Sequence, residues 1–215
     1  METGLLLLVA AGAFLLGSFP TAYVLVRKTS GKDLRTSGSG NIGALNAFEV
    51  SRSKGVGIAV LLIDLVKGAL PVLAVLLFLG DAFVAGAFAY IAVVLGHNYS
   101  PWIGFKGGRG LAPALGASIA FNPAFLIIWI ALWLVTRLWS KDVHVGNIFA
   151  TAVSPFVLFF AAPLAGKLSH FTAPSDMATV AVGTALFVLI FLKHLDPLRA
   201  LIAHRRSGSI PPPEQ

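Results

Sequence analysis

The sequence contains no cysteine and few charged residues, and each shortage excludes a class of protein. Without cysteine among its 215 residues, the chain can form neither disulfides nor thiolate nucleophiles, and it cannot bind a metal through sulfur. Charged residues make up only 12% of the chain, half of the roughly 25% that is typical of a soluble domain. Hydrophobic residues make up 57%, and uncharged apolar stretches recur along the whole length. The composition therefore predicts a helical protein that crosses a membrane several times.

Basic side chains are concentrated in loops between the apolar stretches, and this predicts the orientation. The loop at 27–54 carries six of the 16 Lys and Arg residues, so it is expected to face the cytoplasm. With this orientation only Lys67, inside a span, and Lys167, outside, are not cytoplasmic. The net charge of +7 is therefore assigned to topology and anion binding, and nucleic acid is not an expected partner.

The apolar stretches predict an all-α, polytopic membrane helix bundle of about seven helical segments. The first, 3–26, follows Glu2 and precedes the cations, so we expect a retained helix with the N-terminus outside, not a cleaved signal peptide. The stretch 111–136 would place the basic C-terminus outside if it were one span, so a hairpin broken at Asn122-Pro123 is favoured. The other segments are 55–80, 82–95, 145–165 and 177–192.

This layout describes one domain. Residues 1–205 are expected to form a single transmembrane helical domain with cytoplasmic glycine-rich loops at 27–54 and 96–110. Asp81 and Asn122 are expected at outer turns, and the C-terminus is expected in the cytoplasm, ending in a flexible tail at 206–215.

The stretch 96–110 combines glycines, cations and the start of an apolar helix. Three closely spaced glycines let backbone N–H groups converge, two cations supply fixed charge, and the helix expected from Leu111 adds its positive end. The pattern predicts an anion-binding cradle. A cytoplasmic turn whose cations serve topology alone is the alternative, although topology does not require the glycines.

The first loop contains a literal G-x-G-x-x-G, Gly38-Ser39-Gly40-Asn41-Ile42-Gly43. Dinucleotide binding requires a preceding strand within a βαβ unit, whereas this loop follows a membrane helix, so we reject that interpretation. A plain connector remains the alternative to a polar, backbone-exposing site on the same face as the second loop.

Ionisable residues inside the spans are few. Asp64 and Lys67 share one helix face and lie roughly 15 Å into their span. At this depth we favour an ion pair that supports a site over two residues that take part in the reaction. His194 ends the last span. No Ser–His–acid spacing and no clustered metal-ligand set stands out, so neither metal nor cofactor is expected.

Together these stretches resemble the bacterial acyl-phosphate:glycerol-3-phosphate acyltransferase family, known as PlsY. The resemblance covers nearly the whole chain and is most specific in the combination of the two glycine loops. The matching stretches are 17–20, 38–44, 64–68, 96–110 and His194.

The resemblance implies a multi-pass acyltransferase of the bacterial inner membrane, with its site on the cytoplasmic face and membrane lipid around it. The implied reaction moves an acyl group from acyl phosphate to the 1-hydroxyl of glycerol 3-phosphate, giving lysophosphatidic acid without a cofactor. By position, it implies catalytic roles for Ser39, Asn41 and His194. It implies substrate binding by Gly40, Asn46, His97, Lys106, Gly107, Gly108, Arg109 and Gly110.

The chain departs from the family pattern at several positions. Arg109 stands where the family usually has lysine, Glu49 where it usually has arginine, and Pro197 where it has asparagine. Leu45 and Pro113 stand where the family has threonines. Because of the charge reversal at Glu49, the alternative remains that the protein is a diverged relative that acylates another phosphorylated acceptor.

The implied chemistry suits the residues present. An acyl phosphate is an activated mixed anhydride, so the protein needs only to position two anions and stabilise developing charge. Either a substrate phosphate or His194 would take the hydroxyl proton. A membrane carrier for an organic anion is the other alternative. The absence of a visible repeat and the position of both loops on one face disfavour it.

Overall fold

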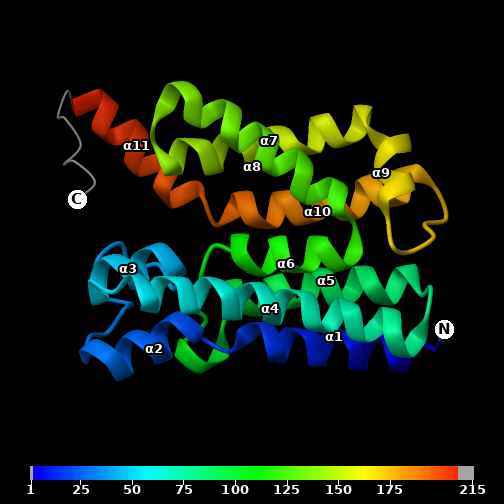
Figure 1. The fold of residues 1–215 in the computed structure, drawn as a ribbon, viewed down its shortest axis with the longest axis horizontal. Helices are drawn as coiled ribbons and strands as arrows, with labels where there is room; N and C mark the ends of the chain where they lie inside the picture. The colour runs from blue at the N-terminus through cyan, green and yellow to red at the C-terminus, as the bar shows by residue number, and fades with distance from the viewer. Residues whose placement is uncertain (1, 208–215) are drawn as a thin grey trace.

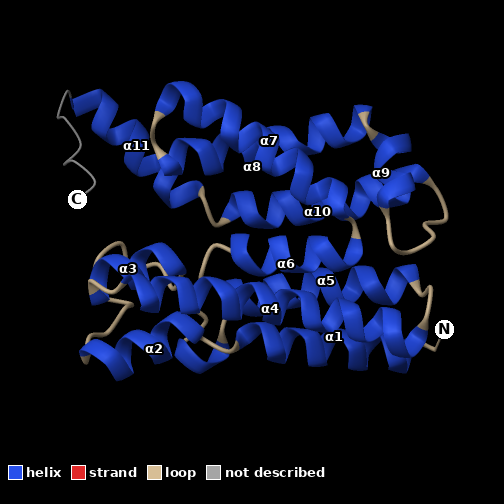
Figure 2. Cartoon of the chain, in the orientation of Figure 1, coloured by secondary structure: helices blue, strands red, loops and turns tan. Residues whose placement is uncertain are grey.

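The computed structural model describes residues 2–207, and this part of the chain consists of helices and loops without a β-strand (Figure 2). The helices lie in two layers, α1 to α6 in one and α7 to α11 in the other (Figure 1). The predicted all-α bundle is confirmed. The helices are α1 Thr3–Ser18, α2 Thr21–Ser30, α3 Ala44–Ser51, α4 Lys54–Leu79, α5 Phe83–Asn98, η1 Pro101–Ile103, α6 Leu111–Phe121, α7 Pro123–Ser140, α8 Val143–Phe160, α9 Ala162–Leu168, α10 Asp176–Leu192 and α11 Leu195–Ser207.

The membrane-crossing helices match the apolar segments of the sequence. Five helical stretches within the described residues are long and apolar enough to span, with α1 and α2 counted together. A sixth is added if α10 and α11, bent by 48°, are one span. Helix α6 has 11 residues and is about 16 Å long, too short for a hydrocarbon core of about 30 Å. Apolar patterning did not predict the short helices α3 and α11, and the segment predicted at 145–165 is divided into α8 and the start of α9.

The first span is broken where the sequence has Pro20. Helix α1 ends at Ser18 and α2 begins at Thr21, because proline has no N–H for the helical hydrogen bond. At the break the carbonyl of Phe19 accepts two hydrogen bonds, from the N–H of Thr21 at 3.0 Å and from Nζ of Lys67 at 2.9 Å. A side chain from another helix thus adds a second partner to a backbone group that membrane lipid cannot satisfy.

The hairpin predicted at Asn122-Pro123 is present as the turn between α6 and α7. The Asn122 side chain accepts a hydrogen bond from the N–H of Ala124 at 3.0 Å and donates one to the carbonyl of Ala165 at 2.9 Å. Asn122 is fully buried within the bundle, and its expected place at a turn on the outer side of the membrane stays a prediction. The short α6 ends inside the bundle, and Asn122 satisfies the polar backbone there.

The C-terminal segment is described only in part. Residues 206 and 207 belong to the end of α11, and the rest of the predicted flexible tail, 208–215, lies outside the described residues.

Close packing of α4 on α6 places the intramembrane ion pair beside the second glycine loop. A side chain at Gly68 of α4 would overlap the backbone of Pro113, and one at Gly116 of α6 would overlap the backbone of Leu65. Glycine at both positions lets the two helix backbones touch. The face of α4 that carries the ion pair therefore lies against the beginning of α6.

A cluster of aromatic rings joins the two layers deeper in the bundle. The ring centroids of Phe121 and Phe171 lie 5.2 Å apart, those of Tyr90 and Phe125 6.2 Å, and those of Phe121 and Phe125 6.2 Å. Such pairs add about 0.5–1.5 kcal/mol each beyond the apolar area they bury. The cluster holds the layers together below the site, so the site itself can remain open.

Candidate active site

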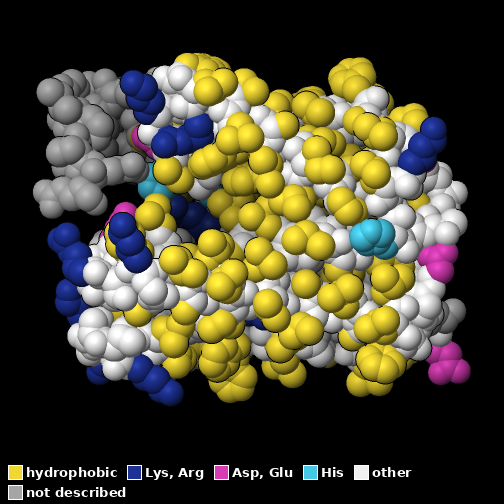
Figure 3. Space-filling model, in the orientation of Figure 1, with side chains coloured by type: hydrophobic (Ala, Val, Ile, Leu, Met, Phe, Trp, Pro, Cys, Tyr) yellow, Lys and Arg dark blue, Asp and Glu magenta, His cyan; other side chains and the backbone are white. Residues whose placement is uncertain are grey.

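A groove of about 520 Å³ opens between the two layers, near the end that carries α3 and α11. Figure 3 shows this hollow with basic side chains inside it. Its polar lining is Asn41, Asp64, His97, Arg109, His144 and Asn147. Its apolar lining includes Leu61, Leu111, Leu115, Trp129, Ile130, Trp133 and Leu134. The groove therefore suits a ligand with an anionic head and an apolar tail.

The outer surface is divided, like the groove, into a charged part and a hydrophobic part. On the face shown in Figure 3, Lys and Arg side chains gather at the end that carries α2, α3 and α11. Hydrophobic side chains cover most of the remaining face. The polar end of the groove thus lies at the basic end of the molecule, and its apolar lining lies towards the hydrophobic belt.

The second glycine loop packs directly on the end of α5. The N–H of Gly108 donates to the carbonyl of His97 at 3.1 Å, and a side chain at Gly108 would overlap the His97 imidazole. Gly110 precedes α6 with a φ of 86°, a conformation that favours glycine. Within the described chain, the N–H groups of Arg109 and Gly110 donate to no protein acceptor. These free amides beside a helix N-terminus have the arrangement of an anion-binding site.

Arg109 is the cation that this loop directs into the groove. Its Nη1 lies 3.3 Å from Nδ1 of His144 at the start of α8, so the contact links the two layers. Because a guanidinium can only donate, Nδ1 of His144 accepts in this contact. Burial lowers the pKa of Arg109, and the charges of Asp196 and Glu49 oppose that change. The guanidinium remains charged at physiological pH.

The first glycine loop is held by the side chain of Asn46. Its Oδ1 accepts from the N–H of Ser39 at 3.0 Å, and its Nδ2 donates to the carbonyls of Ser37 at 3.2 Å and Asn41 at 2.8 Å. Asn46 is 1% exposed. A side chain at Gly38, whose φ is 60°, would overlap the Asn46 amide. The amide therefore acts as an internal clamp that sets the shape of the loop.

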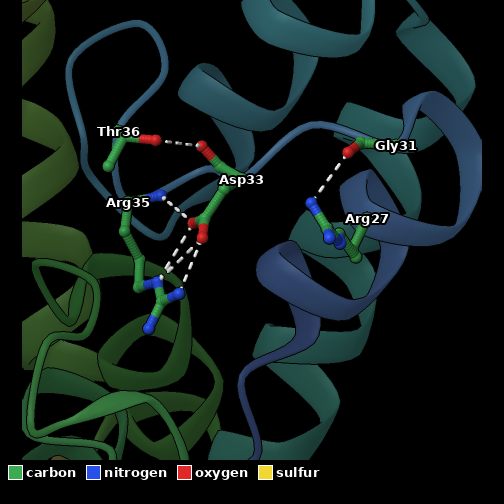
Figure 4. Close-up of polar contacts among 5 residues, drawn as sticks. All are labelled: Arg27, Gly31, Asp33, Arg35 and Thr36. Carbon is green, nitrogen blue, oxygen red and sulfur yellow. Dashed lines mark hydrogen bonds and ion pairs between the residues drawn. The ribbon is translucent and has the colours of Figure 1, made fainter.

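A second set of contacts stabilises the solvent-exposed start of this loop (Figure 4). Nη2 of Arg35 lies 2.6 Å from Oδ2 of Asp33, and Nη1 of Arg27 donates to the carbonyl of Gly31 at 2.9 Å. Hydrogen bonds from Arg35 are the main cause that lowers the pKa of Asp33 to about 2. These contacts are local in sequence, and the Arg35 guanidinium also lies over the ring of Tyr23 on α2, 5.2 Å from its centroid.

The predicted pair in the second span is present and extends towards the site. Nζ of Lys67 lies 2.7 Å from Oδ1 of Asp64, and Oδ2 of Asp64 lies 3.9 Å from Nδ1 of His97. Asp64 is 2% exposed and Lys67 5%. The sequence identified the pair by its spacing, but nothing in the sequence linked it to His97.

His194 lies at the bend between α10 and α11, and its side chain is buried. Its Nδ1 lies 2.9 Å from the carbonyl of Ile190. A carbonyl can only accept, so Nδ1 carries the hydrogen and Nε2 of the neutral ring is left with a lone pair. Nε2 has no hydrogen-bond partner among the described residues.

The residues proposed from the sequence fall into three groups. Asn41, His97, Arg109 and Gly110 line the groove together. Gly107 and Gly108 form the wall behind them, against His97. Ser39 and Lys106 are exposed, Gly40 is half-buried, Asn46 is occupied within its loop, and His194 is buried outside the groove lining. The predicted substrate contacts of the residues in this last group stay predictions.

Two groove residues were missed because they lie on a helix that appeared purely structural. His144 and Asn147 are one turn apart at the start of α8 and share a face. Oδ1 of Asp142 caps this helix by accepting from the N–H groups of His144 at 2.7 Å and Val145 at 3.2 Å. The capping aspartate and the polar pair after it were the available signal.

Comparison with known proteins gives consistent results along nearly the whole chain. Residues 7–204 match the family model described as glycerol-3-phosphate acyltransferase. The chain is 38% identical over 197 residues to a glycerol-3-phosphate acyltransferase of Geobacter metallireducens, covering 92% of this chain and 94% of the relative. It is 40% identical over 173 residues to glycerol-3-phosphate acyltransferase 2 of Moorella thermoacetica, covering 78% and 85%.

Two solved structures have the same fold. The glycerol 3-phosphate form of PlsY (YgiH), an integral membrane glycerol 3-phosphate acyltransferase, aligns with a TM-score of 0.76 at 32% identity, covering 93% of both chains. The lysophosphatidic acid form aligns with a TM-score of 0.73 at 30% identity, again covering 93% of both chains.

Proposed function

Because the chain belongs to the glycerol-3-phosphate acyltransferase family, we propose that it transfers a fatty acyl group from acyl phosphate to the 1-hydroxyl of glycerol 3-phosphate, giving lysophosphatidic acid. The observation that carries this proposal is the division of the groove. Its polar end combines Asn41, His97 and Arg109, and its apolar end leads towards the hydrophobic belt. Both substrates are phosphorylated, and only the donor has a long apolar tail, so this single groove can accommodate both.

The reaction is a direct displacement at the acyl carbonyl. The 1-hydroxyl oxygen forms a bond to the carbonyl carbon, the bond from that carbon to the phosphate oxygen breaks, and inorganic phosphate leaves. The hydroxyl proton passes to a base, either His194 or a substrate phosphate. Phosphate is a good leaving group, so no covalent acyl-enzyme is required. The protein contributes by holding the two substrates in contact and stabilising the negative charge that develops.

The proposed roles follow from position. Arg109, with the free amides of Arg109 and Gly110, binds a substrate phosphate. Asn41 presents its amide to the polar groups of the acceptor, with Ser39 and Gly40 beside it in the same loop. His194 lies outside the groove lining, and its proposed role as a base for the hydroxyl proton rests on the lone pair of its unpartnered Nε2. A substrate phosphate is the alternative acceptor.

The site is assigned to the cytoplasmic face of the bacterial inner membrane. This assignment is supported by the basic end of the molecule, which carries both glycine loops and α11. Because the chain has no cysteine, single cysteines placed near Asp81 or Gly104 can be labelled selectively with an impermeant reagent. Intact cells should label the first and not the second. External labelling at Gly104 would overturn both the topology and the position of the site.

A diverged acceptor preference is the second candidate, and the charge of Glu49 favours it. Glu49 interacts electrostatically with Arg109, so the acceptor end of the groove is less positive than an arginine at that position would make it. This variant of the function keeps acyl phosphate as donor and changes only the phosphorylated acceptor.

The deciding experiment incubates the purified protein with acyl phosphate and an acceptor, then measures phosphate release and identifies the lipid by mass spectrometry. Lysophosphatidic acid formed from glycerol 3-phosphate supports the proposal. Acylation of another phosphorylated alcohol in preference to glycerol 3-phosphate supports the second candidate. Flux of glycerol 3-phosphate through proteoliposomes without any acylated product would overturn both and support a carrier.

A further inference from the structure

We infer that the buried pair Asp64–Lys67 is a positioning device for the anion-binding loop, and that it acts through the imidazole of His97. This inference rests on the proposed function, because the loop is the part of the site assigned to a substrate phosphate. Asp64 and Lys67 would then be positioning residues, with no contact to the reacting atoms.

The first step is the anchorage of Lys67. Its Nζ lies 2.7 Å from Asp64 on its own helix and 2.9 Å from the carbonyl of Phe19 at the break between α1 and α2. The ammonium therefore has two defined partners on different helices. A charge buried to this degree requires such partners, so the position of the Asp64 carboxylate is tightly constrained.

The second step leads from Asp64 to His97. Oδ2 of Asp64 lies 3.9 Å from Nδ1 of His97, and both side chains line the groove. The carboxylate attracts the N–H side of the imidazole and so favours one orientation of the ring. His97 is 7% exposed, which leaves the ring little freedom to turn away.

The third step leads from His97 to the loop. Nε2 of His97 lies against Gly108 so closely that any side chain there would overlap it, and the carbonyl of Ile42 lies against the same glycine. The main chain of His97 also binds Gly108, through the hydrogen bond of 3.1 Å. Gly108 is thus held between His97 and the first glycine loop, and a turned imidazole would displace it.

The competing view is that the pair only holds α1 against α4. A test must therefore remove the pair without leaving a lone buried charge. The double variant Asp64→Leu with Lys67→Met does this, and His97→Ala removes the intermediary. Ser154→Ala, a buried hydroxyl on α8 that bonds only its own helix at 2.7 Å, is the matched control.

The expected result is a split between KM and kcat. In the folded double variant, kcat/KM should fall at least tenfold, mainly through a higher KM for a phosphorylated substrate, while Ser154→Ala stays within twofold of the parent. His97→Ala should cause a similar loss, and the triple variant should lose little more, because all three residues act through one path. Wild-type KM values in the folded double variant, or losses that multiply in the triple variant, would overturn the inference.

If the double variant does not fold, the inference is tested with His97→Ala alone. Unchanged KM values for both substrates in that variant would remove the link between the pair and the loop. Binding of inorganic phosphate, followed by thermal stabilisation of the protein, gives a readout without turnover and should weaken in parallel. Failure of the proposed function is distinguishable, because the parent protein itself would then form no lysophosphatidic acid.

Discussion

The two glycine-rich loops have similar compositions but are held in different ways. The first is shaped from within, by the Asn46 amide and by the exposed Asp33–Arg35 pair. The second is pressed against the end of α5, where a buried ion pair lies behind it. A loop in water can be shaped by local hydrogen bonds. A loop that packs on the helices of a membrane bundle depends instead on buried charged groups, which are stable only when they are paired.

The largest effect is expected from breaking the buried side of this comparison. Lys67→Met leaves Asp64 buried without its partner, which costs about 3–5 kcal/mol of unfolding free energy. The double variant with Asp64→Leu should be more stable than either single variant, because no lone charge remains. Unfolding in detergent, followed by circular dichroism, measures both. A double variant as unstable as the sum of the single ones would contradict the pairing.

The second largest effect is expected at Arg109. Contacts of a charged group with phosphate contribute about 1.5–3 kcal/mol each, so Arg109→Ala should lower acyl-transfer efficiency by roughly ten- to a hundredfold. Arg109→Lys should recover much of it, since lysine keeps the charge. Phosphate release from acyl phosphate is the measurement.

Lys106 provides the matched control for Arg109. It is one of the same loop's two cations but is exposed and does not line the groove. If the cations serve only topology, both alanine variants should behave alike and remain near normal. A specific loss at Arg109 supports the anion site, and equal losses at both would show that Lys106 also reaches the substrate.

An intermediate effect is expected from the clamp of the first loop. Asn46→Ala removes three hydrogen bonds, and the freed polar groups cost about 1–3 kcal/mol each if they stay buried. The exposed loop can rehydrate, so the total should lie near the lower end. Activity should fall with stability, since Asn41 depends on the same clamp. Normal activity in a destabilised variant would separate the loop from the site.

The smallest effect is expected at the exposed pair. The pKa of Asp33 is about 2 in the folded protein, below its ordinary value of 3.8, so its contribution is present above pH 3.8 and disappears as the pH falls towards 2. Asp33→Asn should therefore differ slightly from the parent at neutral pH and not at all near pH 2. Unfolding across this range, at low and high salt, tests it. A large difference at neutral pH would mean that the first loop is not held mainly from within.

The sequence by itself determined what depends on local pattern. Apolar length identified the membrane class, Asn122-Pro123 marked the break between α6 and α7, and the spacing of Asp64 and Lys67 placed their side chains on one face. The glycines and Arg109 indicated an anion site, because their chemistry acts within one loop. Each of these follows from residues that are neighbours along the chain.

Only the tertiary structure decided how these parts meet. It brought His144 and Asn147 of α8 to the groove, directed Asn46 into its own loop, and connected Lys67 to the carbonyl of Phe19 from 48 positions away. It also gave the buried side chain of Asn122 a partner in α9, the carbonyl of Ala165. Such contacts depend on how the helices pack. Because the apolar surfaces of different helices are similar, the sequence pattern of one helix does not indicate which other helix it contacts.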